Sequence, residues 1–156
     1  MSEKYRRLLN GCERADSVVF DAHKMMLMPA LVTGVIFRNA AHSFRTFDDR
    51  ASYLIEKSPQ EEWYNPGHRT MECTKRMLCL KVYAGLMCYG TKFFADYVTR
   101  QYDLARAFAS MLKRADDFEL AIDPDCNIVC FRYAPKGVID LDALNTAIRK
   151  RLVRSG

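Results

Sequence analysis

The chain has 156 residues, of which 49% are hydrophobic and 28% are charged. This length and composition are typical of a globular domain and exclude a disordered tail or a fibrous repeat. The net charge of +5 is small, and acidic residues interleave with most of the basic ones, so we expect no nucleic-acid partner. The basic cluster 149–154 matches a helix end, where the helix dipole favours cations. Binding of a nucleic-acid backbone by this cluster is the alternative, with only its charge in support.

No apolar run approaches the roughly 20 residues that span a bilayer, and the first residues lack the apolar core of a signal peptide. We therefore expect a cytoplasmic protein with no membrane partner. The cysteines form no Cys-x-x-Cys pair, and no paired histidines accompany them, which predicts reduced thiols and no metal site. They are Cys12, Cys73, Cys79, Cys88, Cys126 and Cys130.

Two short strands are predicted in the first part of the chain. Residues 2–10 are typical of the end of a helix that closes at Gly11. The β-branched, apolar runs at 17–21 and 33–38 then predict two strands.

A long region without periodicity separates these strands from two predicted helices. Residues 39–70 predict a loop with one short helix near 48–54, and loops of this length are usually functional. Apolar side chains at helical spacing then predict a helix over 71–89, closed by Gly90, and a second helix up to Asp116.

The end of the chain predicts a small β-β-α unit. Strands are expected at 118–122 and 127–133, joined by a turn around Pro124. A last helix is expected at about 140–152, with Asp140 as its N-cap. The whole order is mixed α/β, with one domain over 1–115 and a smaller one over 116–156.

Lys24 directly follows the first predicted strand and stands beside His23. A lysine amine at the end of a strand is a candidate for forming a Schiff base with an aldehyde cofactor. The alternative is an ordinary solvated lysine, and a lone His-Lys pair does not decide between the two.

Four segments in order resemble the group II pyridoxal-phosphate decarboxylases, which include glutamate, aromatic amino-acid, histidine and cysteine-sulfinate decarboxylases. They are ADSVVFDAHKMM (15–26), ASYL (51–54), ECTKR (72–76) and NIVCFR (127–132). The resemblance implies pyridoxal 5'-phosphate as cofactor and an L-amino acid as substrate. It implies an α/β fold: part of the large domain of a fold-type-I enzyme, similar to aspartate aminotransferase, followed by a truncated small α+β domain.

The resemblance also assigns roles to single residues. It makes Lys24 the Schiff-base lysine, places His23 as an N–H donor to the cofactor phosphate, and places Asp21 near that phosphate in an orienting role. Tyr53 matches a lid tyrosine that returns a proton to the substrate carbon after carbon dioxide leaves. Thr74 stands where many relatives have glycine or serine, at a turn that reaches the phosphate of the neighbouring subunit of a homodimer. A packed histidine and a loop-packing tyrosine are the structural alternatives for His23 and Tyr53.

Other parts of the family's pocket lie upstream of the lysine in relatives, beyond the 23 residues that precede Lys24 here. They include the aspartate that pairs with the pyridine nitrogen and most of the phosphate-binding hydroxyls. We therefore expect a fragment of a decarboxylase that acts only together with a missing N-terminal half. The alternative is an inactive remnant that binds a partner or dimerises through the surfaces where that half would pack.

Overall fold

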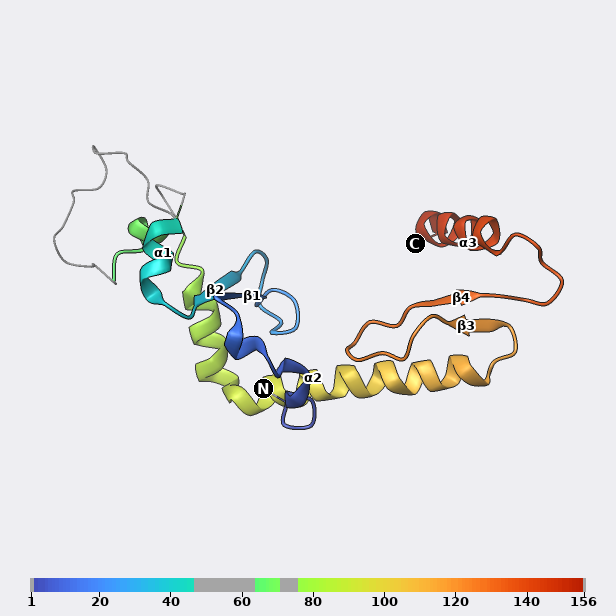
Figure 1. The fold of residues 1–156 in the computed structure, drawn as a ribbon, viewed down its shortest axis with the longest axis horizontal. Helices are drawn as coiled ribbons and strands as arrows, with labels where there is room; N and C mark the ends of the chain where they lie inside the picture. The colour runs from blue at the N-terminus through green and yellow to red at the C-terminus, as the bar shows by residue number, and fades with distance from the viewer. Residues whose placement is uncertain (1, 47–63, 71–75, 156) are drawn as a thin grey trace. The chain divides into compact units, whose positions relative to one another are not determined.

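The computed structural model describes residues 2–46, 64–70 and 76–155 (Figure 1). The elements in chain order are the 3-10 helices η1 (Arg6–Leu9) and η2 (Cys12–Arg14), strands β1 (Ser17–Asp21) and β2 (Thr33–Phe37), helix α1 (Ala40–Thr46), 3-10 helix η3 (Pro66–Arg69), helix α2 (Cys79–Arg114), strands β3 (Phe118–Leu120) and β4 (Phe131–Tyr133), and helix α3 (Leu141–Ser155). Two compact units are present: Leu9–Phe94, and Met1–Leu8 together with Ala95–Gly156. The domain boundary at 115/116 stays a prediction.

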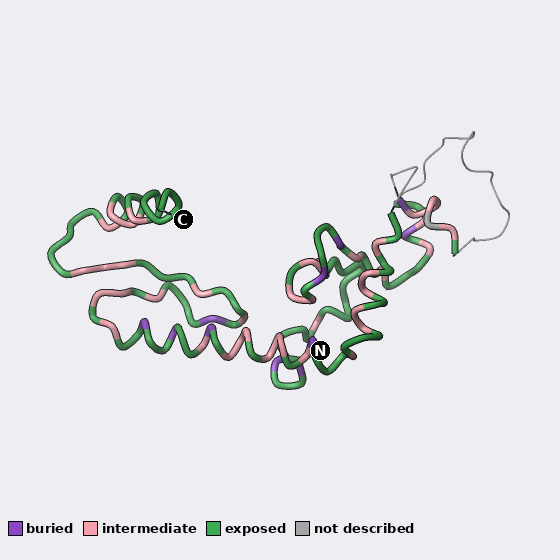
Figure 2. Tube along the Cα trace, turned by 180° about the vertical axis from the view of Figure 1, so that it is seen from behind, coloured by how far each residue is buried: buried purple, intermediate pink, exposed green. Residues whose placement is uncertain are grey.

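In the unit Leu9–Phe94, β1 and β2 form an antiparallel pair, with Ser17 opposite Phe37 at one end and Asp21 opposite Thr33 at the other. Most residues of both strands are exposed, in keeping with the few buried segments of Figure 2. Phe20 lies opposite Gly34, and a Cβ added at Gly34 would lie 2.4 Å from the Phe20 ring. Glycine at this position therefore leaves room for the aromatic side chain.

The core of this unit lies beneath the connection between the strands. It consists of Ala22, Met28, Val32 and Phe94, with partly buried Met26, Leu78, Val82 and Leu86 packed against them. The first half of α2 thus packs on the segment 22–32. Gly85 of α2 allows this approach, because a Cβ there would lie 2.4 Å from Met28 Cε and 3.2 Å from its Sδ.

Helix α2 departs from helical geometry at Gly90, whose φ of 70° lies in a region that favours glycine. The break predicted there is confirmed. The helix begins later than predicted, because residues 76–78 are not helical.

Residues 39–70 contain more structure than the sequence indicated. The prediction of a loop is wrong at α1, where Asn39 Oδ1 accepts from the Ala41 amide and starts the helix. The short helix expected near 48–54 lies outside the described residues. The strands at 17–21 and 33–38 are confirmed as β1 and β2 within one residue.

In the other unit, the start of the chain is fastened to the second half of α2. Tyr5 is buried, its ring centroid lies 4.8 Å from that of Tyr102, and its hydroxyl donates to Asp103 Oδ1 at 2.5 Å. Lys4 Nζ pairs with the same carboxylate oxygen at 2.6 Å. These hydrogen bonds lower the pKa of Asp103 and raise the pKa of both Lys4 and Tyr5.

Strands β3 and β4 pair antiparallel, from Phe118 opposite Tyr133 to Leu120 opposite Phe131. Both strands are shorter than predicted. Phe131 contacts Phe108 of α2 edge to face, with the ring centroids 5.4 Å apart. The contact fixes the hairpin on the helix.

Helix α3 begins as predicted, since Asp140 Oδ1 accepts from the Ala143 amide at 2.8 Å. The Asn145 side chain joins α3 to β4 by bonding both the amide and the carbonyl of Tyr133, as the backbone of a neighbouring strand would. Its Oδ1 accepts from the Tyr133 amide at 3.0 Å, and its Nδ2 donates at 2.8 Å to the carbonyls of Tyr133 and Leu141.

Candidate functional site

Lys24 lies in a turn that directly follows β1. Its amide donates to the Asp21 carbonyl at 3.1 Å, and its carbonyl accepts from the Leu27 amide at 3.1 Å. The side chain is 67% exposed, and Nζ lies 2.5 Å from Asp21 Oδ2. The backbone of the lysine is therefore fixed while its amine remains accessible to a carbonyl compound.

Asp21 is the side chain that holds this amine. Its Oδ1 accepts a hydrogen bond from Thr33 Oγ1 at 2.6 Å, which leaves Oδ2 for Lys24. The hydrogen bond from Lys24, and then that from Thr33, hold the pKa of Asp21 below its ordinary value. The carboxylate is thus ionised and oriented by two donors.

His23 is engaged with the opposite end of the same loop. Its Nδ1 lies 2.8 Å from the Val32 carbonyl oxygen and 3.1 Å from the Val32 amide nitrogen. The tautomer with the proton on Nε2 accepts from the amide, and the one with the proton on Nδ1 donates to the carbonyl. With Nδ1 turned toward Val32, Nε2 is the nitrogen left for a ligand, as the expected phosphate contact requires.

Packing beneath the turn explains how a loop can present these groups. The Met28 amide donates to the Ala22 carbonyl at 3.1 Å, and both residues belong to the core. From α2, Lys81 Nζ reaches the Ala30 carbonyl at 3.5 Å. The loop is fixed on both sides of Lys24, so the lysine sits on a rigid base.

The remaining two predicted site residues, Tyr53 and Thr74, lie outside the described residues. The structure brings Asp21, His23 and Lys24 together and adds Thr33, which sequence reasoning missed. The signal that points to Thr33 is strand pairing: once 17–21 and 33–37 are read as a hairpin, Thr33 falls opposite Asp21.

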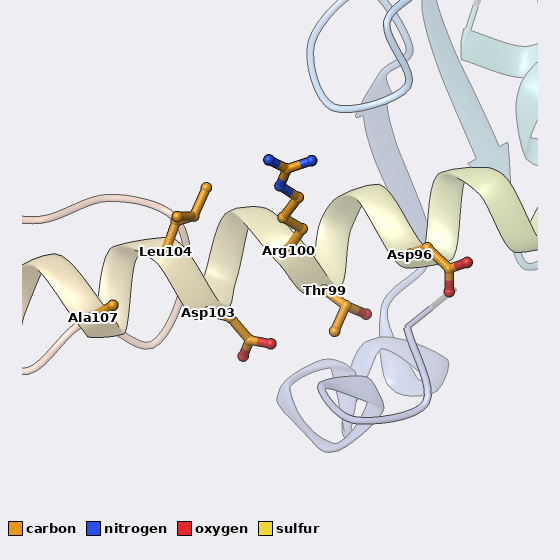
Figure 3. Close-up of a pocket in the computed structure, with 6 residues that line it drawn as sticks. All are labelled: Asp96, Thr99, Arg100, Asp103, Leu104 and Ala107. Atoms are coloured by element: carbon orange, nitrogen blue, oxygen red, sulfur yellow. The ribbon is translucent and has the colours of Figure 1, made fainter.

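Two hollows among the described residues are lined by other side chains than Asp21, His23, Lys24 and Thr33. One of about 430 Å³ borders α2 at Asp96, Thr99, Arg100, Asp103, Leu104 and Ala107 (Figure 3). Figure 3 shows Arg100 and Leu104 on one side of the helix, and Thr99 and Asp103 on the other. Another of about 250 Å³ lies at the far end of the β1–β2 pair, lined by Asp16, Ser17, Phe37, His42, Arg45 and Thr46.

Within the described ranges, no group of three or more His, Cys, Asp or Glu side chains is arranged to hold a metal ion. The described cysteines are free thiols, and Cys73 lies outside the described residues. No helix among the described segments is long and apolar enough to cross a membrane.

The family described as "Pyridoxal-dependent decarboxylase conserved domain" matches residues 1–134. The chain is 29% identical over 152 residues to the L-aspartate decarboxylase dtxS4 of Metarhizium robertsii, covering 96% of this chain and 30% of that protein. It is 31% identical over 155 residues to the aromatic-L-amino-acid decarboxylase of Bacillus atrophaeus, covering 99% and 32%. The chain thus spans about a third of the length of these relatives.

Solved structures show the same fold. Oryza sativa TDC, crystallised with PLP and tryptamine, superposes with a TM-score of 0.84 at 21% identity, covering 99% of this chain and 33% of that one. Mouse CSAD gives a TM-score of 0.80 at 22% identity, covering 99% and 34%. The predicted fold class is confirmed: the chain has part of the α/β fold of these fold-type-I enzymes.

The chain belongs to the pyridoxal-dependent decarboxylase family. The described residues fit the family's cofactor in two respects. An accessible primary amine such as that of Lys24 can condense with an aldehyde, and in the tautomer with its proton on Nε2, His23 has a donor suited to a phosphate oxygen. Asp21 does not fit as a phosphate ligand, because an anionic carboxylate repels phosphate and both its oxygens already accept hydrogen bonds.

Proposed function

We propose that this chain contributes the Schiff-base lysine to an enzyme that removes carbon dioxide from an L-amino acid. One observation carries the proposal: in a chain of this family, Lys24 presents an exposed amine from a turn whose backbone is anchored on both sides. A lysine held in this way can attack an aldehyde without first ordering its own loop.

Each predicted site residue has its own role in this proposal. Lys24 holds the cofactor through Nζ, and His23 donates a hydrogen bond from Nε2–H to its phosphate. Bound there, pyridoxal phosphate supplies the electron sink that stabilises the carbanion left by departing carbon dioxide. By resemblance, Tyr53 returns a proton to that carbon from a closing lid, and Thr74 donates to the phosphate of a neighbouring subunit.

The whole protein is proposed to be a cytoplasmic homodimer in which further chain completes the pocket. Exposed apolar side chains support the contacts with further chain and with a second subunit. Both faces of the β1–β2 pair are uncovered, with Val19 63% and Ile36 60% exposed. Strands that are apolar on both faces normally lie inside a larger covered sheet. A second exposed stripe, formed by Leu80, Tyr83 and Met87 on α2, supports a subunit surface.

The chemistry of Lys24 is tested by trapping. The 156-residue chain is mixed with pyridoxal phosphate, reduced with borohydride and digested, and the lysines that carry the cofactor are identified by peptide mass. We expect the label at Lys24, its loss in Lys24→Ala, and its retention in Lys81→Arg. Lys81 is a matched control, because it contacts the same loop through Ala30, and arginine keeps a donor for that carbonyl while it removes the amine.

A label spread evenly over the lysines, or unchanged in Lys24→Ala, would refute this role. Release of carbon dioxide is then measured for aspartate, cysteine sulfinate and aromatic amino acids, first with the chain alone and then with the complete protein. Release that requires Lys24 and only the complete protein fits the proposal. A complete protein that binds the cofactor at Lys24 and releases no carbon dioxide would refute the decarboxylase function.

A further inference from the structure

We propose that Asp21 is the counter-ion of the Lys24 nitrogen, both in the ammonium group of the free lysine and after that nitrogen has become part of a protonated Schiff base. We propose further that Thr33 fixes the carboxylate in this position. The Schiff-base half of the proposal rests on the proposed function. It assigns to Asp21 a role toward the reacting nitrogen instead of the expected place near the phosphate, and it adds Thr33 to the site.

The geometry is that of a carboxylate with two separate tasks. Oδ1 accepts from Thr33 Oγ1 at 2.6 Å, and Oδ2 lies 2.5 Å from Lys24 Nζ. Asp21 and Thr33 are directly opposed in the β1–β2 register, so the strand pair itself sets the hydroxyl against the carboxylate. The Asp21 side chain is only 28% exposed, against 67% for Lys24, so the anchored partner is the anion.

The contact between Asp21 and the Lys24 nitrogen can persist when a Schiff base forms, because the same nitrogen atom becomes the imine nitrogen. Nζ first gives up a proton, and its lone pair then attacks the aldehyde carbon; a C=N bond replaces C=O, and the carbonyl oxygen leaves as water. The imine nitrogen is positively charged when it carries a proton. A carboxylate fixed within hydrogen-bond distance of that atom favours this charged form, which is the form more readily attacked by a substrate amine.

Other charged groups around the pair are few among the described residues. His23 neighbours Asp21 and, when protonated, lowers its pKa further. Lys81 of α2 reaches the loop at Ala30. Both are cations or potential cations, so neither replaces Asp21 as a negative partner for the nitrogen.

The test follows the absorption spectrum of the bound chromophore against pH, using the 156-residue chain loaded with pyridoxal phosphate or with pyridoxal. The long-wavelength band reports the protonated imine. We expect Asp21→Asn to lower the midpoint for loss of this band by on the order of one pH unit, about tenfold in the proton equilibrium. Thr33→Val should lower the midpoint by less, and Thr33→Ser, which keeps the hydroxyl, should leave the midpoint at its wild-type value. Asp16→Asn, which removes an acid at the far end of β1, should leave it unchanged.

A second measurement needs no cofactor. The Asp21 carboxyl is titrated by its carbon resonance in the wild-type chain and in Lys24→Met, which keeps the stem and removes the charge. The pKa of Asp21 should rise toward its ordinary value in the variant. An unchanged Asp21 titration, or the same imine midpoint in wild type and Asp21→Asn, would overturn the counter-ion role. A chain that shows the Asp21 shift and forms no Lys24 adduct would contradict the proposed function and the imine half of this inference, while the pair in the free amine would stand.

Discussion

Packing of Met28 against Gly85 holds the Lys24 loop on α2, and a pair of substitutions can measure that packing. In Gly85→Ala the new Cβ would lie 2.4 Å from Met28 Cε and 3.2 Å from Sδ. Cε is a flexible end that can turn aside, but Met28 is only 9% exposed, with Ala22 and Val32 in the same core. We therefore expect the usual cost of overpacking, about 1–3 kcal/mol.

A second effect has the opposite sign. Replacing glycine by alanine inside a helix stabilises it by about 1 kcal/mol. In the wild-type background, Gly85→Ala should therefore change the free energy of unfolding by between about 0 and 2 kcal/mol, in the destabilising direction. In a Met28→Ala background the clash is absent, and the same substitution should stabilise by about 1 kcal/mol. The difference between backgrounds, about 1–3 kcal/mol, is the coupling between the two residues.

The assay is urea unfolding of the four proteins, followed by far-ultraviolet circular dichroism, with equal denaturant slopes as the check that the unfolded states are comparable. Trapping of pyridoxal phosphate at Lys24 is measured on the same proteins. We expect Gly85→Ala alone to reduce the preference for Lys24 over other lysines. Equal effects of Gly85→Ala in both backgrounds would show that Met28 does not rest on Gly85, and the reasoning about the loop's anchor would fail.

Two further predictions concern the other compact unit. Asn145→Asp keeps an acceptor for the Tyr133 amide but places a carboxylate oxygen against two carbonyls, so the free energy of unfolding at neutral pH should fall by about 1–3 kcal/mol. In acid the protonated carboxyl can donate again, and part of this loss should be recovered. Denaturation at the two pH values checks this, and an equal loss at both would contradict it. Asp103 has a pKa below the ordinary 3.8, because Lys4 donates a hydrogen bond to it. The stabilisation of the fold by the ionised Asp103 carboxylate is therefore fully present above pH 3.8 and is lost as the pH falls through the lowered pKa. Asp103→Asn should therefore flatten the acid side of the stability–pH curve, and an unaltered acid side would refute the assignment.

Local sequence signals predicted much of the fold. The β-branched runs gave β1 and β2, Gly90 gave the break in α2, and Asp140 gave the start of α3. Helix α1 was missed because seven residues are too few to show a period, and a capping side chain at Asn39 was the main signal. The predicted lengths of β3 and β4 were too long for a different reason: the ends of a strand depend on its pairing with a neighbour, which the sequence does not show.

By itself the sequence determined the family of this chain and predicted Lys24 as its Schiff-base lysine, because the motif around Lys24 is contiguous. It did not determine which groups contact the Asp21 carboxylate. The tertiary structure decided this, because the register of β1 with β2 sets Thr33 against one carboxylate oxygen and leaves the other for Lys24. Hydrogen-bond partners across a strand pair are far apart in sequence, and only the folded backbone brings them within reach.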